Sequence, residues 1–277
     1  MLCSGLNEIG KSTQRGDNRL NDQRVPSHAM TPPRQRADRL LVERGFFESR
    51  AKAQAAIEAG LVSAAGVVVR KASDELPLDA AIQAAPAHPY VSRGGLKLAA
   101  ALDHFHFNPR GRVCLDVGAS TGGFTQVLRE RGARHVYAVD VGRDQLHASL
   151  RGLPDVTVRE ETDIRDIRPG LFGEPPALAV IDVSFISLKL VLPAVTALVA
   201  PDACLVALIK PQFEAGRAHL KKGVVRDAGV QKAVCGDISG SARTLGWHVL
   251  DIIPSPIAGG DGNKEFLLGA MRTQQQI

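Results

Sequence analysis

The fold is decided by the stretch Val113-Cys-Leu-Asp-Val-Gly-Ala-Ser-Thr-Gly-Gly-Phe124. An apolar run leads into a glycine-rich turn, and an amphipathic segment over Gly123–Arg131 follows. This order predicts a buried strand over Val113–Val117, a tight turn and a helix that begins at the turn. Such a unit is typical of an α/β fold that binds a cofactor at the carboxyl end of its strand.

The same alternation continues on both sides of this unit. Short apolar runs predict further strands, and periodic segments between them predict helices at Leu188–Val199 and Gly229–Leu245. We therefore expect a Rossmann-like, doubly wound sheet of seven mostly parallel strands. Besides Val113–Val117, its strands are predicted at His135–Val139, Val156–Val158, Leu178–Asp182, Cys204–Ile209, Val249–Ile253 and Phe266–Ala270.

The glycine-rich turn and an acidic residue after the next strand indicate an adenosine-containing cofactor. Glycine has no Cβ atom, so Gly118, Gly122 and Gly123 allow the backbone to approach a ligand closely. Asp140 lies about 20 residues further on, where a carboxylate can accept both ribose hydroxyls. Glycines also occur in such turns for steric reasons alone, so the turn is weak evidence without Asp140.

The detail of the turn favours S-adenosylmethionine over a dinucleotide. The spacing is G-x-x-x-G-G instead of G-x-G-x-x-G, and Asp116 precedes it. A carboxylate there repels pyrophosphate but suits the ammonium of a methionine group, directly or through water. Asp163 follows the third strand and can accept from an adenine amino group; capping the next helix is a nearly equal alternative.

Four ionisable residues stand where this fold places its chemistry. Asp182 and Lys210 each close an apolar strand, Glu265 precedes the last strand, and Lys97 lies at the start of a helix ahead of the core. Unpaired buried charges are costly, so packing alone explains the first two poorly. An ordinary surface ion pair is the alternative for each, and for Lys97 alone that alternative is stronger.

Together the four residues suit methyl transfer to a hydroxyl group. The hydroxyl oxygen has to lose its proton and lie in line with the methyl group. A lysine can take that proton only if its pKa falls through burial or a second cation. We expect Lys210 nearest the target hydroxyl, with Asp182 and Glu265 orienting and balancing charge. Lys97 is expected to position the target and to shift the pKa of Lys210.

Composition excludes several classes of protein. The chain has 277 residues with 44% hydrophobic and 4% aromatic residues, which is ordinary for a globular protein and argues against rows of stacking aromatics. Its longest apolar runs are too short to cross a bilayer, and we expect no membrane partner. The four cysteines are scattered, which suits reduced thiols in the cytoplasm and predicts no metal site.

The positive charge is concentrated near the start. Residues 34–71 hold eight Lys or Arg against four Asp or Glu, so they contribute +4 of the net charge of +5. A basic segment ahead of a neutral body favours a polyanion such as nucleic acid as partner, although a solvated helix face is the plain alternative. We predict a disordered tail over 1–33, an RNA-binding domain over 34–83, a linker over 84–92 and a catalytic domain over 93–277.

The basic segment contains a recognisable motif. Helices are predicted at Ala37–Arg44 and Arg50–Ala59, the second capped by Ser49 and ended by Gly60, with short strands after them. The pattern Ser49-Arg50…Ala53…Ile57…Gly60…Val62 resembles the RNA-binding domain first seen in ribosomal small-subunit protein S-four. That family usually has Val-Asn-Gly in the next turn. Here Ala64-Ala65-Gly66 stands there, which leaves the loop conformation open.

Six motifs in order resemble the TlyA family, whose members have an FtsJ-like (RrmJ-type) methyltransferase core. They are Tyr90-Val-Ser-Arg-Gly-Gly-Leu-Lys-Leu98, Asp116-Val-Gly-Ala-Ser-Thr-Gly-Gly-Phe124, Asp182-Val-Ser-Phe-Ile-Ser187, Lys210-Pro-Gln-Phe-Glu214, Gly223-Val-Val-Arg-Asp227 and Gly262-Asn-Lys-Glu-Phe266. The resemblance covers roughly residues 34–272. It implies a catalytic tetrad at Lys97, Asp182, Lys210 and Glu265, and 2′-O-methylation of cytidine in ribosomal RNA of the small subunit and, for longer members, of the large subunit.

We expect two further sets of residues to contact ligands. For S-adenosylmethionine they are Asp116, Gly118, Ala119, Ser120, Gly122, Gly123, Phe124, Asp140, Asp163 and Asp182. For RNA they are Arg36, Arg39, Arg50, Lys52, Gln54, Lys71, Arg93, Arg217, Lys221 and Lys222. The last three belong to residues 211–226, which we call the basic loop. It departs from the family in length and is expected to lie over the RNA backbone, with a merely solvated loop as an equal alternative.

Three rival functions remain at this stage. The TlyA family often carries the name haemolysin, which would mean a membrane-active protein, but nothing in the sequence favours it. A small-molecule O-methyltransferase fits the core but leaves the basic segment unexplained. An RNA-binding protein with a non-catalytic cofactor fold is opposed by the intact tetrad. We expect a monomer in the cytoplasm that acts on ribosomal RNA or ribosomal subunits.

Overall fold

The computed structural model describes residues 33–272, so almost all of the tail predicted over residues 1–33 lies outside the described residues. The chain divides into two compact units, with the boundary between Ala87 and His88. Each unit has its own hydrophobic core.

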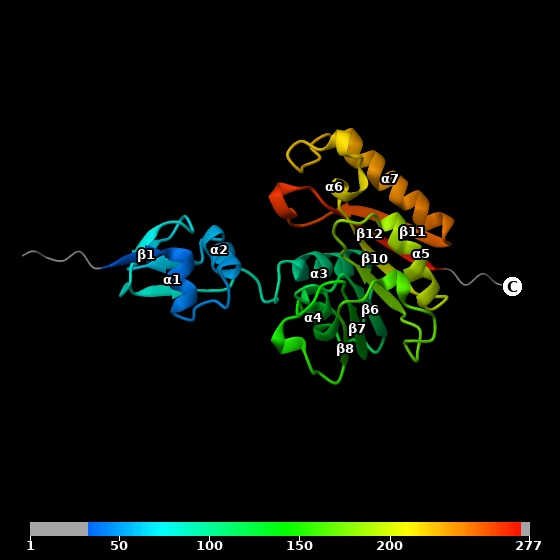
Figure 1. Ribbon diagram of the computed structural model, residues 1–277, viewed down its shortest axis with the longest axis horizontal. Coiled ribbons are helices and arrows are strands. Elements are labelled where there is room, and N and C mark those ends of the chain that lie inside the picture. Colours follow the sequence, from blue (N-terminus) through cyan, green and yellow to red (C-terminus); the bar gives the residue numbers. More distant parts are fainter. Residues whose placement is uncertain (1–32, 273–277) are drawn as a thin grey trace, which may run out of the picture. The chain divides into compact units, whose positions relative to one another are not determined.

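The first unit packs two helices against two small antiparallel sheets (Figure 1). Ser49 caps the second helix, because its hydroxyl oxygen accepts a hydrogen bond from Lys52 N at 3.3 Å, as predicted. Leu41 and Ile57 are among the buried residues that join the helices to the strands. The elements are α1 (Ala37–Glu43), α2 (Arg50–Glu58), the pair β1 (Arg34–Arg36) and β4 (Glu75–Pro77), and the sheet β3 (Val67–Val68), β2 (Val62–Ala64) and β5 (Ile82–Ala84).

The turn between β2 and β3 keeps a regular hairpin form despite its unusual sequence. Ala65 has φ +49° and Gly66 has φ +80°, so both central residues are left-handed. That conformation suits a two-residue hairpin but favours asparagine or glycine over alanine. The alanine that departs from the family pattern therefore occupies the usual backbone conformation at an energetic cost.

The second unit is a three-layer α/β domain (Figure 1). Its helices α3 and α4 pack on one face of the sheet, and α5 and α7 pack on the other. The helices are α3 (Gly94–Phe105), α4 (Gly123–Glu130), α5 (Leu188–Leu198), the short α6 (Pro211–Glu214) and α7 (Ala228–Thr244). The strands are β6 (Val113–Val117), β7 (His135–Val139), β8 (Val156–Arg159), β9 (Leu178–Ile181), β10 (Cys204–Ile209), β11 (Trp247–Pro254) and β12 (Phe266–Arg272).

The seven strands form one sheet in the order β11-β12-β10-β9-β6-β7-β8. The pairs among β6 to β10 are parallel, and β12 is antiparallel to both of its neighbours, which confirms the mostly parallel sheet. From β6 the chain proceeds to β7 and β8 on one side and then crosses to β9 on the other. Such a reversal opens a crevice at the carboxyl ends of the central strands, β6 and β9.

The helix α3 has 12 residues, an extent that the sequence did not indicate. The sequence places Lys97 at a helix start but does not indicate the extent of that helix, because Gly94 and Gly95 are poor helix formers. Close packing explains Gly95 of α3 and Gly123 of α4. A Cβ atom on Gly95 would lie 2.4 Å from the ring of Tyr90, and one on Gly123 of α4 would lie 2.2 Å from Ser92 Oγ.

Candidate active site

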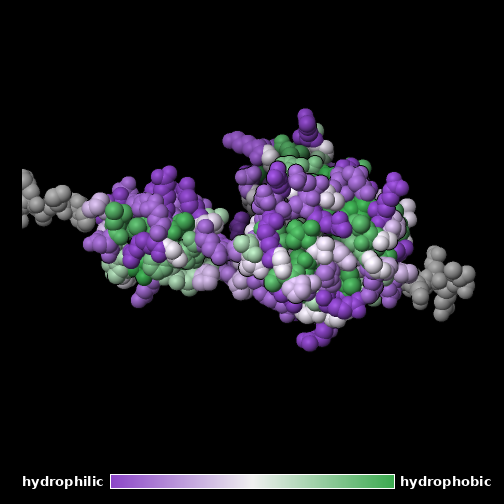
Figure 2. All heavy atoms as spheres, turned by 60° about the horizontal axis from the view of Figure 1, so that its bottom comes forward, coloured by the Kyte–Doolittle hydropathy of each residue, from purple (hydrophilic) through white to green (hydrophobic). Residues whose placement is uncertain are grey.

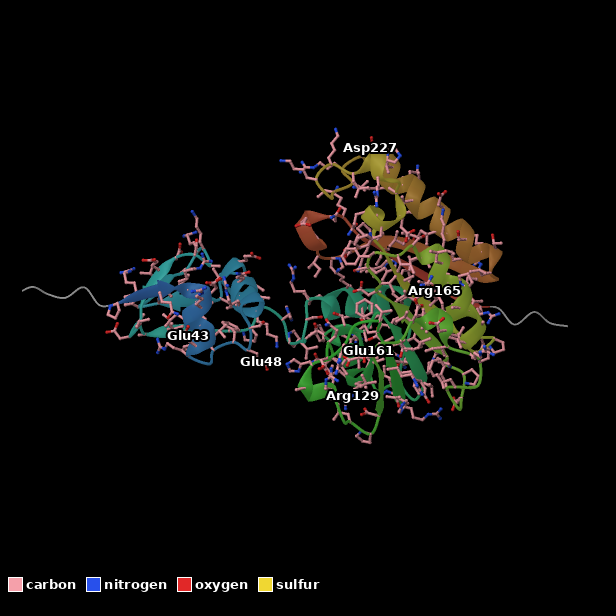
Figure 3. The ribbon with its side chains drawn as sticks, in the orientation of Figure 1. Glu43, Glu48, Arg129, Glu161, Arg165 and Asp227 are labelled. Carbon is pink, nitrogen blue, oxygen red and sulfur yellow. The ribbon has the colours of Figure 1, made fainter. Side chains whose placement is uncertain are left out.

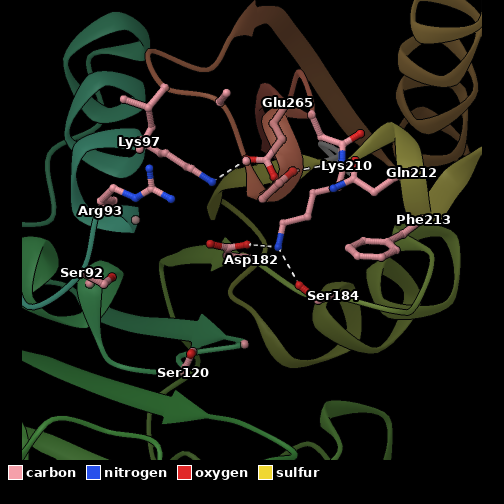
Figure 4. Close-up of a pocket in the computed structure, with 18 of the residues that line it drawn as sticks. Ser92, Arg93, Lys97, Ser120, Asp182, Ser184, Lys210, Gln212, Phe213 and Glu265 are labelled. Atoms are coloured by element: carbon pink, nitrogen blue, oxygen red, sulfur yellow. Dashed lines mark hydrogen bonds and ion pairs between the residues drawn. The ribbon is translucent and has the colours of Figure 1, made fainter. Parts of the chain in front are cut away.

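A cavity of about 630 Å³ lies at the carboxyl ends of the central strands. All four ionisable residues of the predicted tetrad line it, although they come from α3 and from the ends of three strands (Figure 4). Lys97, Lys210 and Glu265 are buried, and the side chain of Asp182 is 21% exposed. The structure therefore brings together residues that are up to 168 positions apart in sequence.

The tetrad forms two ion pairs rather than one mixed cluster. Lys97 Nζ donates to Glu265 Oε2, and Lys210 Nζ lies 2.5 Å from Asp182 Oδ1 (Figure 4). The Lys97–Glu265 pair is the more enclosed, with side chains 10% and 3% exposed. Each cation thus has its own counter-charge, which is what buried charges require.

Lys210 is held from two sides. Its Nζ donates to Ser184 Oγ at 2.9 Å as well as contacting Asp182 (Figure 4). The contact with Asp182 Oδ1 lacks hydrogen-bond geometry, and this oxygen has no hydrogen-bond partner among residues 33–272. The amine is therefore fixed in place, and the carboxylate retains capacity to accept.

The glycine-rich turn forms the floor of both this cavity and a neighbouring one of about 470 Å³. Gly118 has φ +82°, and a Cβ atom there would lie 2.4 Å from the carbonyl oxygen of Asp182. Asp140 accepts from Ser120 N at 2.8 Å and from Gly142 N at 2.7 Å, so it ties the turn to β7. Gly118, Ser120 and Asp182 line both cavities, which therefore meet at the tetrad.

Asp116 lies beneath the turn with no exposed surface. Its Oδ2 accepts from Thr125 Oγ1 at 2.6 Å, while its buried Oδ1 has no hydrogen-bond partner within the described part of the chain. Burial raises the pKa of Asp116 to about 7. It lines neither cavity, so it can act on a ligand only through the backbone turn or through water.

The structure distributes the other predicted cofactor residues unequally. Ala119, Gly123 and Phe124 line the larger cavity, and Asp140 and Asp163 line the smaller one. Gly122 lines neither cavity. A Cβ atom there would lie 2.4 Å from Leu150, so glycine is required at this position for steric reasons. Asp163 caps a short 3₁₀ helix by accepting from Arg165 N at 2.9 Å, and the Arg165 guanidinium lowers the pKa of the Asp163 carboxyl.

Several residues of the site were not predicted. Ser184 is one, and two aromatic residues beside it are others. Phe185 is 90% exposed at φ +65°, and its ring centroid lies 5.0 Å from that of Phe213. A residue other than glycine in a left-handed conformation is uncommon, and Phe185 lines both cavities. The motifs Asp182-Val-Ser-Phe and Lys210-Pro-Gln-Phe contain these residues, but their role depends on the two loops lying side by side.

Glu214 explains why the two loops lie together. Its Oε1 accepts from Leu188 N at 2.8 Å, and its Oε2 accepts from Ser187 Oγ at 2.5 Å. A carboxylate at the N-terminus of α5 satisfies free backbone donors and balances the helix dipole. It links the loop after β10, which carries Lys210, to the loop after β9, which carries Asp182.

The residues predicted to contact RNA fall on both units. In the second unit, Arg93 lines the larger cavity, and Arg217, Lys221 and Lys222 are exposed on the basic loop. Leu220 and Gly223 of that loop line the cavity as well. Asn263 anchors the loop, because its Nδ2 donates to Gly223 O at 3.2 Å. The loop leads into α7, which Asp227 caps (Figure 3).

In the first unit, some of the residues predicted to contact RNA form ion pairs or hydrogen bonds with other residues of the protein. Arg39 and Lys71 are exposed, and Lys52 pairs with Glu48 at 2.5 Å. Arg36, Arg50 and Gln54 all donate to Asp38, a feature that the sequence did not indicate. Hydrophilic residues cover much of the visible surface of this unit, with apolar residues between them (Figure 2).

Within residues 33–272 we find no cluster of three or more His, Cys, Asp or Glu side chains that could hold a metal ion. Over the same residues no helix is both long enough and apolar enough to span a bilayer.

Comparison with known proteins gives matches to both units. A family model described as FtsJ-like methyltransferase matches residues 90–272, and one described as S4 domain matches residues 35–82. The chain is 44% identical over 246 residues to the 16S/23S rRNA (cytidine-2′-O)-methyltransferase TlyA of Mycobacterium tuberculosis, covering 87% of this chain and 91% of that protein. It is also 44% identical over 243 residues to a candidate rRNA methyltransferase, YqxC, of Bacillus subtilis, covering 86% of each.

A solved structure is similar over the same extent. It is described as a candidate hemolysin of Streptococcus thermophilus, is 39% identical and superposes with a TM-score of 0.70. The match covers 88% of this chain and 90% of that one. The resemblance therefore includes both units.

Proposed function

The chain belongs to the FtsJ-like methyltransferase family, and from that membership we propose that it methylates a ribose 2′-hydroxyl of ribosomal RNA, with cytidine as the target nucleoside. The activity itself is that of a methyltransferase dependent on S-adenosylmethionine. One observation supports a hydroxyl group as the methyl acceptor. One cavity is lined by the four ionisable residues Lys97, Asp182, Lys210 and Glu265.

The residues of the turn fit this cofactor. S-adenosylmethionine supplies an electrophilic methyl group on a sulfonium centre. We assign Gly118 and Ser120 to the backbone that lies against it, because a side chain on Gly118 would collide with the end of β9. Asp140 retains free lone pairs on both carboxylate oxygens and is assigned to the ribose hydroxyls. Asp116 is assigned to the methionine ammonium through the turn or through water, with its carboxylate ionised above about pH 7 and its Oδ1 free to accept.

We assign the removal of the hydroxyl proton to Lys210. A neutral amine has two N–H groups and one lone pair. When Lys210 is neutral, one of its N–H groups donates to Ser184 Oγ, and the contact with Asp182 Oδ1 keeps the amine in place. Its lone pair can then accept the proton of the 2′-hydroxyl. With S-adenosylmethionine bound, its sulfonium centre would supply the methyl group to the oxygen that Lys210 frees of its proton. The proton leaves through Lys210 to solvent.

The second ion pair has a positioning role in this proposal. Lys97 and Glu265 are more enclosed than Lys210 and Asp182, and their charges neutralise each other. We assign them to the wall against which the target ribose rests. Phe185 lies exposed at the junction of the two cavities and is assigned to the target base.

The choice of RNA as the polymer rests on charge and on the S4 domain. Residues 34–71 carry most of the net positive charge, and the S4 domain covers residues 35–82. The exposed cations of the basic loop lie next to the larger cavity. Each region provides exposed cations that suit an RNA backbone.

The test uses tritiated S-adenosylmethionine with ribosomal subunits and, separately, small alcohols. We expect transfer to the subunits only. Lys210→Ala should lower that transfer by about 10²- to 10⁴-fold, the usual contribution of a proton-transferring group. Its affinity for S-adenosylmethionine in calorimetry should change less than threefold. Lys189→Ala, which removes an exposed lysine of α5, is the matched control. Full activity of Lys210→Ala would refute the assignment.

A membrane-active function is the second candidate, because the similar Streptococcus structure is described as a candidate hemolysin. Lysis of erythrocytes by the purified protein in the absence of S-adenosylmethionine would support it. We expect the purified protein to cause no more lysis than the control, which is the Lys210→Ala protein after unfolding by heat.

A further inference from the structure

Among residues 33–87 of the first unit, one carboxylate is fully buried. Asp38, the second residue of α1, has no exposed surface. A buried charge is costly unless it is paired and hydrogen-bonded. Most acidic residues avoid such positions, so the contacts of Asp38 call for an explanation.

Three side chains donate to this carboxylate. Arg36 contributes Nε to Oδ1 at 3.1 Å and Nη2 to Oδ2 at 3.2 Å. Arg50 contributes Nε and Nη2 to Oδ2, at 3.1 and 2.6 Å, and Gln54 contributes Nε2 to the same oxygen at 3.0 Å. The hydrogen bond from Arg36 and those from the other two hold the pKa of Asp38 well below its usual range, so the group is an anion.

The other side of this cluster faces solvent. The side chains of Arg36 and Arg50 are 43% and 49% exposed. Each guanidinium has five N–H donors and uses two of them on Asp38, which leaves three for a ligand. The buried anion offsets the repulsion between the two cations, so they can remain side by side with a net charge of +1. Paired guanidinium forks match the oxygens of a phosphate group.

We propose that Asp38 is a positioning residue that holds Arg36 and Arg50 together as a clamp for a phosphate of the RNA backbone. Asp38 itself does not touch the RNA. The inference rests on the proposed function only in taking RNA as the polyanion. If positive charge alone governed RNA binding, Asp38 would weaken it. The clamp instead requires this buried negative charge for binding a negative ligand.

The test exploits this difference in sign. Asp38→Asn removes a negative charge from the unit, so simple electrostatics predicts tighter RNA binding. Loss of the clamp predicts the opposite. With the full chain and small-subunit ribosomal RNA transcribed in vitro, we expect filter binding to show about tenfold weaker affinity for Asp38→Asn. In methyl transfer the variant should raise KM for RNA while kcat stays within twofold.

The matched control is Asp79→Asn, which removes the same charge from an exposed position of the same unit. Its RNA affinity should equal or exceed that of the unmodified chain. Two further variants, Arg36→Lys and Arg50→Lys, keep the charge but remove the planar fork. Each should weaken RNA binding severalfold. Affinity for S-adenosylmethionine should remain unchanged in all four, since that site lies in the other unit.

The outcomes separate the inference from the proposed function. If Asp38→Asn melts at the temperature of the unmodified chain and binds RNA as tightly or more tightly, the inference is wrong. Should that variant fail to fold, unchanged RNA affinity in both lysine variants would overturn it instead. RNA binding without any methyl transfer by the unmodified chain would refute the proposed function alone. No RNA affinity in the unmodified chain would refute both.

Discussion

At the scale of single residues, Asp116 is the clearest case of a group whose burial serves the site at the expense of stability. Its carboxyl has no exposed surface, one unpartnered oxygen and a pKa raised to about 7 by burial. In the unfolded chain an aspartate has a pKa near 3.9. Between about pH 4 and pH 7 this carboxyl is therefore ionised in the unfolded chain but still protonated in the folded chain.

This difference predicts how Asp116→Asn changes stability with pH. The contribution of Asp116 to folding is complete below about pH 4, falls as the pH rises to 7 and is constant above it. The asparagine variant does not lose stability in this way as the pH rises. Its free energy of unfolding should exceed that of the unmodified chain by up to about 4 kcal/mol at pH 8 and differ little from it at pH 4. Urea unfolding at both pH values measures it.

The same variant should bind the cofactor less well. Asparagine has no negative charge to offer a methionine ammonium, so calorimetry at pH 8 should show affinity for S-adenosylmethionine at least tenfold lower. Equal affinity of both proteins would mean that Asp116 only supports the turn. Thr125→Val, which removes the hydroxyl that donates to Asp116, serves as a control for packing beneath the turn.

The enclosed ion pair of Lys97 and Glu265 gives a second prediction at this scale. Replacing either residue alone, as Lys97→Met or Glu265→Leu, leaves an unpaired buried charge and should cost about 3–5 kcal/mol. The double variant removes both charges and should recover most of that loss. Methyl transfer should stay impaired in all three proteins. Additive losses of stability in the double variant, measured by urea unfolding, would argue against a direct pair.

At the scale of elements, the loops after β9 and β10 determine the site. Glu214 from one loop accepts hydrogen bonds at the start of α5, which follows the other. This contact brings Lys210 towards Asp182 and Phe213 towards Phe185. The loop that continues from Glu214 carries the exposed cations of the basic loop.

The basic loop provides a prediction about RNA. Each lysine that neutralises a phosphate contributes about one unit to the slope of log affinity against log salt. Lys221→Ala combined with Lys222→Ala should lower that slope by about two and raise KM for RNA, with kcat and cofactor affinity retained. The control removes two exposed cations of α7 with Lys232→Ala and Arg243→Ala. Equal salt slopes for all three proteins would show that the loop is merely solvated.

The elements that the sequence predicted are those with a strong local signal. Every predicted strand of the large sheet and the helices α4, α5 and α7 are confirmed, with ends that differ by a few residues. The strands are buried on both faces of the sheet, so they appear in the sequence as continuous apolar runs that are easy to recognise. The extent of α3 was not predicted because its first turn is glycine-rich for packing reasons. Strands β1, β2, β4 and β5 are three residues long, too short for a periodic pattern.

The candidate site was predicted to a similar degree. Asp182 and Lys210 close buried strands, a feature visible in the sequence, whereas Lys97 and Glu265 depended on the family resemblance. The pairing of each lysine with one carboxylate was not foreseen. Nor were Ser184, Phe185 and the carboxylate of Asp38, because their roles arise from segments that only the fold brings together.

At the scale of the whole molecule, charge and chemistry are divided between two units. The first unit contains the S4 domain and a cluster of exposed cations, and the second contains the cavity with the tetrad. Binding energy from a remote part of a large substrate can raise the rate of a reaction at a distant group. We therefore expect recognition of the RNA and selection of the ribose to depend on different residues.

The central claim is methyl transfer to a ribose 2′-hydroxyl of ribosomal RNA, and mapping 2′-O-methyl marks tests it most directly. Ribosomal RNA from cells with the gene, without it, and with the Lys210→Ala gene should be compared position by position. We expect at least one cytidine that carries the mark only when the unmodified protein is present. Identical maps in all three, or a mark that persists with Lys210→Ala, would contradict it.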